Sequence, residues 1–366
     1  MTSSRWKITI KYLGVLLLFI PMVFIKSIGM GSSDIAAVWV TLVALLGSLL
    51  ALNHMHLCRT EKYVWLLLLT LGLIIMLTTG KYIVFLSIYS LFAINKLNLQ
   101  KLIKVISIVC FVAFLIVILT NWNNFSYETR LINGEWTGII KRSNGIYVSF
   151  FMLFNLFLLN NKKKHVFEYV IYAIVGVATY MYTTSRTGIV CFLFEFFLLF
   201  LFSRKGFQKS KIVKFFVCYS PIIIFAVIVG VTVFYSYIPG IDYVNLLLQH
   251  RLVQCSKIVS LYPITLLGQH VTISTVIETY LVMDNTYINL LVNYGLILSL
   301  LWILINIKTL KYLYKTSNYY GLVVVMAYSL YGITESFVIV SFLNASFLLY
   351  SEYLTNKFQD RKPICA

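Results

Sequence analysis

Long apolar runs alternate with short polar connectors along almost the whole chain, and one polar stretch, Ser236–Asn285, is much longer than the others. Most apolar runs have about 17–23 residues, which matches the hydrocarbon core of a bilayer at about 1.5 Å per residue. A helix satisfies all of its backbone hydrogen bonds within one such run. The pattern therefore predicts an all-α polytopic membrane protein.

Twelve such spans can be assigned, and together they predict a single integral membrane domain over residues 1–366. The third and fourth lie close together around Thr79-Gly80-Lys81, where they either cross separately, merge into one span or form a re-entrant segment. The predicted spans are 8–26, 35–52, 63–79, 81–95, 102–120, 144–160, 167–184, 188–203, 212–235, 285–306, 320–334 and 337–355.

Composition supports this class, because 60% of the residues are hydrophobic and 11% are charged, whereas about 25% charge is usual in soluble domains. The net charge of +18 follows from topology and requires no nucleic acid. Of the 30 basic residues, 22 fall in one set of alternating connectors, which places that set and both termini in the cytoplasm. The other set holds eight: Lys26, Lys81, Arg130, Lys141, Arg142, Arg186, Arg251 and Lys257.

The six cysteines show no CxxC or Cys/His spacing, so neither a disulfide framework nor a metal site is expected. The chain also lacks the glycine patterns of nucleotide-binding loops and an HExxH motif. We therefore expect no cofactor.

Two extracytoplasmic loops are predicted, at 121–143 and 236–285. In the larger one, apolar residues from Val244 to Val259 recur at helical spacing. This stripe predicts one amphipathic helix with His250, Gln254 and Lys257 on its flank, ended by Pro263. A turn is expected over 266–270, and the periodicity of 272–283 favours neither helix nor strand.

Arg186 lies in a connector so short that its guanidinium is expected at the outer membrane surface. Arginine there suits a phosphate or diphosphate through paired, charge-assisted hydrogen bonds, and it equally suits an anchor to lipid headgroups. Arg251 on the predicted loop helix has the same two interpretations. His270 is either a solvated loop residue or a general base.

Two carboxylates are expected at the outer face. Asp284 opens the tenth span, where it suits an N-cap or a proton acceptor, and Glu335 lies in the connector between the last two spans. Glu195 falls in the middle of a span. At that depth an ionisable group is costly unless it faces the interior of the helix bundle, where a protonated structural role and a role in activity both fit.

These features together resemble the bacterial oligosaccharide repeat-unit polymerases and the related O-antigen ligases. The resemblance rests on ten or more spans with both termini inside and on one large outer loop late in the chain. It also rests on three short segments: Ser185-Arg186-Thr187-Gly188, Gln249-His250-Arg251-Leu252 with a following Leu267-Gly268 turn, and Asp284-Asn285-Thr286-Tyr287 continuing to Asn293-Tyr294-Gly295. The architecture covers nearly the whole chain, and the segments are individually common.

The resemblance implies a metal-independent, inverting glycosyltransferase of the membrane-embedded C type in the bacterial cytoplasmic membrane. It would join sugars carried on undecaprenyl diphosphate at the outer face, with a chain-length regulator as a further partner. Arg186 and Arg251 would hold the donor diphosphate. Family members often have a histidine before the residue that matches Asn285, but this chain has Asp284, which leaves Asp284, His270 and Glu335 as candidate acceptor bases.

Three other functions fit the pattern. A transporter such as a flippase for the lipid-linked repeat unit shares the span number, although the charges gather at one face and no pair of Gly/Pro-broken spans marks a central site. An O-antigen ligase shares the donor and differs in the acceptor. A membrane scaffold without activity leaves the outer arginines without a role.

Overall fold

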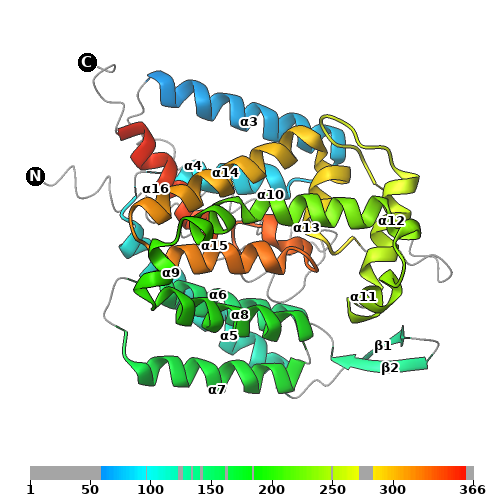
Figure 1. Cartoon of the computed structure of the whole chain (residues 1–366), viewed down its shortest axis with the longest axis horizontal. Coiled ribbons are helices and arrows are strands. Elements are labelled where there is room, and N and C mark those ends of the chain that lie inside the picture. Colours follow the sequence, from blue (N-terminus) through cyan, green and yellow to red (C-terminus); the bar gives the residue numbers. More distant parts are fainter. Residues whose placement is uncertain are drawn as a thin grey trace, which may run out of the picture. The chain divides into compact units, whose positions relative to one another are not determined.

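The structure, a computed structural model, describes residues 59–359 except 96, 123–126, 133–134, 141–142, 161–163, 184, 249 and 272–282. Side chains are described outside 59–60, 120–144 and 358–359 as well as outside those gaps. The chain forms two compact units. Unit 1 contains the described residues of Ala93–Phe194, and unit 2 contains those of Leu57–Phe92 and Glu195–Ala366. Figure 1 labels the elements.

Unit 1 is built around a helix buried on all sides. Its elements are α5 (Leu99–Trp122), β1 (Tyr127–Ile132), β2 (Glu135–Ile140), α6 (Ser143–Leu159), α7 (Val166–Thr183) and the start of α8 (Arg186–Phe202). Helix α6 packs against both α5 and α7. Its Phe150 and Phe154 contact Phe192 of α8 with ring centroids 5.2 and 4.9 Å apart. Such close packing holds helices together where lipid offers no hydrophobic drive.

Unit 2 contains α3 (Arg59–Thr79), most of α4 (Ile83–Ile94) and the end of α8. It continues with α9 (Lys205–Lys209), α10 (Lys211–Val233), the 3-10 turn η1 (Tyr235–Tyr237), α11 (Ile241–Leu247) and α12 (Arg251–Leu261). The remaining elements are α13 (Thr286–Asn289), the π-helical turn η3 (Leu290–Tyr294), α14 (Gly295–Lys315), α15 (Tyr319–Tyr331), the 3-10 turn η4 (Ser336–Ile339) and α16 (Ser346–Gln359).

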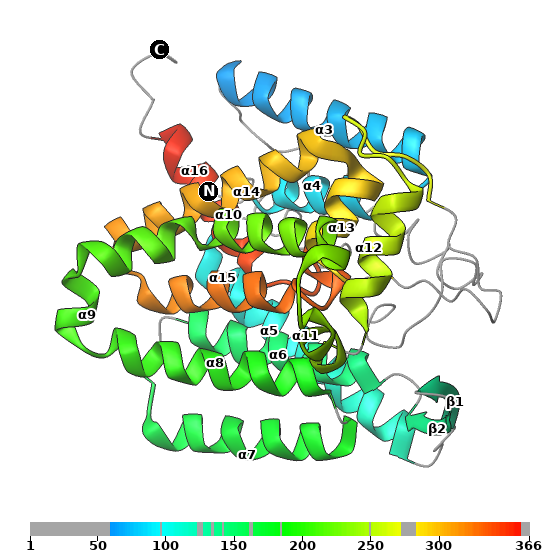
Figure 2. The same ribbon diagram turned by 45° about the vertical axis from the view of Figure 1, so that its right-hand side comes forward.

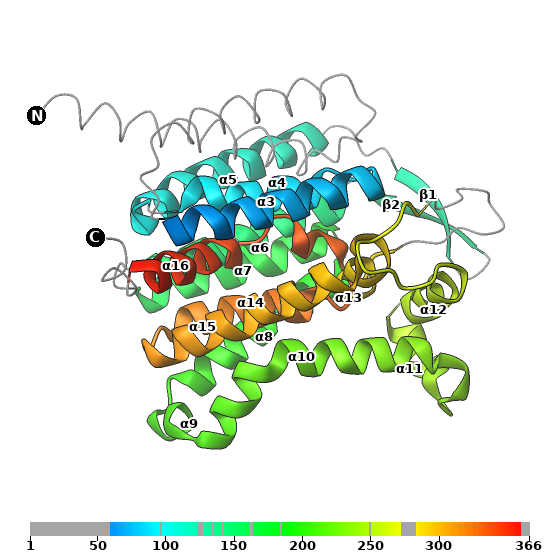
Figure 3. The ribbon, with the colours of Figure 1, turned by 90° about the horizontal axis from the view of Figure 1, so that it is seen from above.

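Helix α10 packs along α14 and α15, and α12 packs at the carboxyl end of α10 (Figure 3). The connectors after α3, after α10 and after α15 are joined at that end by hydrogen bonds and an ion pair. We call it the α12 end of unit 2. The sequence predicted that Lys81, the loop 236–285 and Glu335 share one face, and within unit 2 their connectors do meet.

Five helical stretches in the described part of the chain are long and apolar enough to cross a membrane: Glu61–Thr79, Leu99–Leu119, Val166–Thr183, Lys211–Val233 and Thr286–Lys315. Three further apolar helices are shorter, and Ile83–Ile94 has 12 residues, or about 18 Å. The predicted spans 8–26 and 35–52 lie outside the described residues. A helical membrane-type fold is therefore present, and the number twelve stays a prediction.

The last predicted span, 337–355, is not one helix. Turn η4 ends at Ile339, and α16 begins only at Ser346. Asn344 explains the break, because its amide donates to the carbonyl of Val338 at 2.7 Å and its oxygen accepts from the amide of Ser346 at 2.9 Å. A side chain that bonds to nearby backbone groups competes with the helix ladder.

The predicted loop helix is also divided into two pieces, α11 and α12. His250 between them has a left-handed backbone (φ 60°), and its amide donates to the carbonyl of Asn245 five residues earlier. This is the bond pattern that commonly closes a helix. His250 therefore lies before α12, not on its flank. The predicted end before Pro263 is correct, since α12 ends at Leu261.

The smaller loop, 121–143, departs from the all-α expectation. Strands β1 and β2 form an antiparallel hairpin in which Tyr127 pairs with Ile140 and Ile132 with Glu135. The sequence did not predict this hairpin, because alternation of apolar and polar residues over only six positions is a weak signal for a strand.

Candidate functional site

The α12 end of unit 2 brings together side chains of α12, α13 and η3 and of the connectors after α3, α12 and α15. Two groups can be distinguished. The carboxylate cluster consists of Arg251, Asp284 and Glu335, and the amide cluster consists of Lys81, His270, Asn289 and Asn293. Figure 2 shows the segment after α12 reaching the carboxyl end of α3.

In the carboxylate cluster, one arginine faces two acidic side chains. Nη1 of Arg251 donates to Oε1 of Glu335 at 3.1 Å, and Nη2 lies 3.6 Å from Oδ2 of Asp284. The side chains of Arg251 and Glu335 are 15% and 14% exposed, whereas that of Asp284 is 34% exposed. The structure thus brings Arg251 together with both candidate carboxylates.

Arg251 is placed by the break between α11 and α12. The side chain of the buried Asn245 accepts a hydrogen bond from the amide of Val253 at 3.2 Å, within the first turn of α12. The side-chain nitrogen of Asn245 lies 3.3 Å from Nδ1 of His250. Asn245 therefore fixes the start of α12, and Arg251 is its first residue.

Asp284 and Glu335 are placed by hydrogen bonds between their two connectors. The amide of Thr286 donates to the carbonyl of Gly332 at 2.8 Å, and the Thr286 hydroxyl donates to the carbonyl of Glu335. The side-chain amide of Asn285 donates to the carbonyl of Ile333. Asn285 is also the N-cap of α13, so the expectation that Asp284 caps this helix is wrong. Asp284 remains available for Arg251.

Electrostatics distinguish the two carboxylates. Burial raises the pKa of Glu335 to about 7, Arg251 opposes that shift, and the charge of Asp284 adds to it. Near neutral pH the Glu335 carboxyl therefore has substantial populations with and without its proton. That is the range in which a side chain acts well as a general base.

The amide cluster is centred on the half-buried Lys81. Its amino group donates to Oδ1 of Asn293 at 2.7 Å. The Asn293 amide in turn donates to Oδ1 of Asn289 at 2.6 Å and to the sulfur of Met283 at 3.0 Å. Burial lowers the pKa of the Lys81 ammonium. Among the residues that the structure describes, no carboxylate pairs with Lys81.

A close contact between two glycines holds the following loop on this cluster. Gly268 and Gly295 both have positive φ, 86° and 89°. A Cβ on Gly268 would lie 2.2 Å from the carbonyl oxygen of Asn293, and one on Gly295 would lie 2.3 Å from the amide nitrogen of Gly268. Only glycine fits either position, which gives both glycines of the quoted segments a structural role.

His270 belongs to the amide cluster. The ring is exposed, and Nδ1 lies 2.9 Å from the carbonyl oxygen of Thr79. Because a carbonyl only accepts, Nδ1 carries the proton, and Nε2 is left as the basic atom of a neutral ring. In the described part of the chain no hydrogen bond joins His270 to the carboxylate cluster.

Sequence reasoning did not select Lys81, Asn289 or Asn293. One signal for Lys81 was present, because it is among the few cations on the sparsely basic side and follows a glycine between two apolar runs. The two asparagines sit four residues apart, and the π-helical turn that positions Asn293 has no clear mark in the sequence. Such turns are frequent at functional sites.

Arg186 lies in unit 1 as the exposed first residue of α8. It forms no hydrogen bond or ion pair with any residue that the structure describes. Two residues later, Gly188 packs on α6, where a Cβ would lie 2.2 Å from the ring of Tyr147. Each unit is described by itself, so the meeting of Arg186 with Arg251 stays a prediction.

Glu195 is fully buried, as the mid-span position predicted. Among the described residues, no three His, Cys, Asp or Glu side chains are grouped as metal ligands.

Comparison with known proteins gives no match: no family model, no curated protein and no solved structure is similar to the chain. The resemblance to the repeat-unit polymerases therefore stays a prediction, and the geometry of the α12 end is the basis for a proposal.

Proposed function

We propose that this chain is a glycosyltransferase that joins oligosaccharide repeat units carried on undecaprenyl diphosphate, at the outer face of the bacterial cytoplasmic membrane. The observation that carries the proposal is the carboxylate cluster. There a buried carboxyl, whose pKa burial raises to about 7, contacts an arginine at the joined ends of several helices. A proton acceptor and a cation side by side are what this transfer requires.

In the proposed reaction, the acceptor hydroxyl attacks the anomeric carbon of the donor sugar from the face opposite the diphosphate. The bond between that carbon and the diphosphate oxygen breaks, and a new glycosidic bond forms with inversion. The hydroxyl proton goes to the ionised carboxylate of Glu335 and leaves later to water. Asp284, the more exposed of the two acids, is the alternative acceptor.

Because Arg251 contacts Glu335, the charge state of Glu335 determines how much of the positive charge of Arg251 is available to the diphosphate. Before transfer, the two carboxylates compensate the guanidinium. Once Glu335 has taken the proton it becomes neutral, and its attraction to Arg251 weakens. Arg251 then carries positive charge that is available when the leaving diphosphate gains its negative charge. This order keeps Arg251 as a diphosphate ligand, as the family resemblance implies.

Lys81 and Arg186 are the other cations that we assign to the diphosphate. In the described residues neither has an acidic partner. Lys81 is half-buried, where an ionised amine is costly without a counter-charge. His270, whose Nε2 is the basic atom, lies against Thr79 and Gly80, next to Lys81 in the sequence, and is a second position for orienting the acceptor.

The test is elongation by the purified full-length protein supplied with a lipid-diphosphate-linked repeat unit. We expect a ladder of products, which Glu335→Gln, Arg251→Ala and Arg186→Ala abolish while the protein still inserts into the membrane. Lys257→Ala, an exposed cation on α12, is the matched control and should retain the ladder. Products limited to a single transfer onto a lipid-A core acceptor would indicate a ligase.

A transporter for the lipid-linked repeat unit is the second candidate, because the chain breaks between η4 and α16 and this break contains the buried Ser341 and Asn344. Interrupted helices are typical of transporter binding sites. However, both ends of the Asn344 side chain are bonded within the segment. Absence of a ladder together with movement of the substrate across vesicles would favour the transporter.

A further inference from the structure

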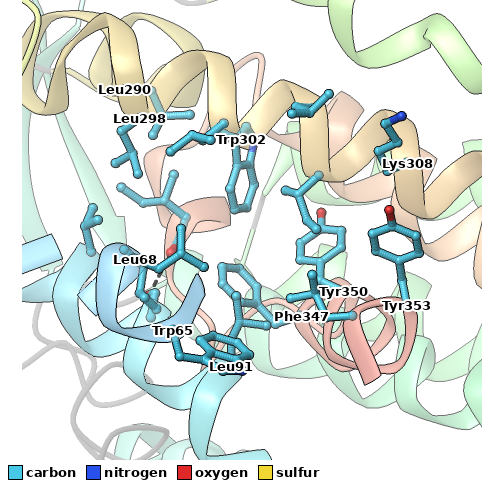
Figure 4. Close-up of a pocket in the computed structure, with 18 of the residues that line it drawn as sticks. Trp65, Leu68, Leu91, Leu290, Leu298, Trp302, Lys308, Phe347, Tyr350 and Tyr353 are labelled. Atoms are coloured by element: carbon cyan, nitrogen blue, oxygen red, sulfur yellow. Dashed lines mark hydrogen bonds between the residues drawn. The ribbon is translucent and has the colours of Figure 1, made fainter. Parts of the chain in front are cut away.

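Unit 2 contains a second, chemically different site, which begins at Leu290 and extends along α14 away from the carboxylate cluster. It is an apolar cavity of about 250 Å³ between α3, α4, α14 and α16. Figure 4 shows aromatic side chains around it, including Trp65, Trp302 and Tyr350. Its length follows α14 from Leu290 in η3 to Lys308.

The walls of this cavity offer almost nothing for water to bind. Two polar side chains of the wall are already bonded inside the protein: the Ser87 hydroxyl donates to the carbonyl of Ile339 at 2.9 Å, and the Tyr350 hydroxyl donates to Oδ1 of Asn306 at 2.7 Å. A cavity with apolar walls stays dry or takes a hydrocarbon. An alkyl chain is therefore the kind of group that fits.

One end of the cavity is basic, in contrast to its apolar walls. Lys308 of α14 and Lys357 of α16 both line the cavity and both are exposed. Tyr353 also lines the cavity, and its ring centroid is 5.9 Å from the amino group of Lys357. Figure 4 shows Lys308 and Tyr353 at the same end of the cavity. No acidic side chain lines the described wall, so this end is suited to an anionic group.

We propose that the cavity binds one acyl chain of an anionic phospholipid, with the lipid phosphate at Lys308, Lys357 and Tyr353. The cavity is lined by residues of α3 and α14, which belong to the stretches long and apolar enough to cross a membrane, so lipid is a ligand within its reach. Both lysines belong to the connectors that the charge distribution places on the cytoplasmic side, where anionic lipid is abundant. The lipid stabilises the packing of α3 and α4 on α14 and α16. This inference does not depend on glycosyl transfer.

Quenching of tryptophan fluorescence tests the site directly, because bromine on an acyl chain quenches a ring that it touches. The probes are vesicles of phosphatidylcholine that contain a dibrominated chain on either phosphatidylglycerol or phosphatidylcholine. Trp302 and Trp65 line the cavity, and the difference between wild type and Trp302→Phe isolates the signal of Trp302 among the six tryptophans. We expect half-maximal quenching of Trp302 at an about 5- to 30-fold lower fraction of the anionic lipid, because two lysines each contribute about 1 kcal/mol near an anionic group.

The double variant Lys308→Gln/Lys357→Gln should reduce that preference about 5- to 30-fold, since each lysine near an anionic surface contributes about 1 kcal/mol. Its matched control is Lys311→Gln/Lys315→Gln, which removes two charges from α14 outside the cavity wall and should leave the preference unchanged.

Several results would overturn the proposal. One is equal quenching of Trp302 by both lipids in the wild type, and another is an equal loss of preference in the control variant. Stronger quenching by free dibromostearate than by the phospholipid would make the ligand a fatty acid. Absence of any lipid quenching of Trp302 would mean that another segment of the chain or a second copy fills the cavity. If the protein makes a ladder of products but quenching of Trp302 shows no lipid preference, the proposed transferase function is retained and the lipid site is rejected.

Discussion

Arg251 and Lys81 both lie at the α12 end of unit 2, and their surroundings are opposite. Arg251 has a carboxylate at each of its two terminal nitrogens, whereas Lys81 bonds to the neutral Asn293 and to no carboxylate among the residues that the structure describes. A buried charge with partners contributes to a fixed geometry, whereas a buried charge without one costs free energy that an incoming anion removes. Under the proposed function, the first cluster combines proton transfer with an arginine that binds the diphosphate only once Glu335 is neutral, and the second offers a cation that can bind it from the start.

The largest effect should follow from removing the compensated cation. Arg251→Met leaves Glu335 buried without a partner, so we expect the free energy of unfolding in detergent to fall by about 3 kcal/mol at pH 8. The loss should be smaller at pH 6, because Glu335 then takes a proton. Elongation should be abolished at both pH values. Equal stability of Arg251→Met and the control Lys257→Met would show that the ion pairs contribute nothing.

Glu335→Gln removes the proton acceptor and keeps the shape of the side chain. We expect kcat of elongation to fall about 10²- to 10⁴-fold, the usual contribution of a general base. Asp284→Asn should have the smaller effect if Glu335 is the base. The reverse order, measured in the same assay, would assign the role to Asp284.

Removal of the uncompensated cation should change binding and leave stability almost unchanged. In Lys81→Met we expect KM for the lipid-diphosphate donor to rise about 10- to 100-fold, because one charge-assisted contact to phosphate is lost. The free energy of unfolding should change by less than about 1 kcal/mol, since a half-buried charge is removed together with one hydrogen bond. A large loss of stability with unchanged KM would make Lys81 a structural residue.

The smallest effect on chemistry should come from the loop that covers the amide cluster. Gly268→Ala forces a Cβ against the Asn293 carbonyl, so we expect it to cost about 2 kcal/mol more than Gly240→Ala. Gly240 also has positive φ, 73°, but nothing lies within 4 Å of its added Cβ. The difference in unfolding free energy between the two variants thus measures the contact of Gly268 with Asn293. Equal costs would show that this contact contributes nothing.

Topology made part of this site predictable. Counting basic residues placed Arg251, Asp284 and Glu335 at one face, and the structure joins their side chains. The helix breaks were not predictable, because they depend on where single asparagines bond. Asn245 starts α12, Asn285 instead of Asp284 caps α13, and Asn344 interrupts the last predicted span.

Lys81 was missed for a related reason. It stands out because no carboxylate in the described part of the chain pairs with it, which composition and spacing do not report. Likewise, Asn293 depends on a π-helical turn that is stabilised by the tertiary contact of Gly268 with Gly295. The local pattern of apolar and polar residues predicts the helices, whereas contacts between segments distant in the sequence determine which polar side chains meet.

The pH dependence of a single round of elongation tests the central claim most directly, with saturating donor and the wild type beside Glu335→Gln. Only the ionised carboxylate of Glu335 accepts a proton, and burial raises its pKa to about 7. The account therefore predicts a wild-type rate that rises about tenfold per pH unit below that value and is constant above it. The variant should be slow and independent of pH over the same range. The same rising profile in both proteins would contradict the assignment of Glu335 as the base.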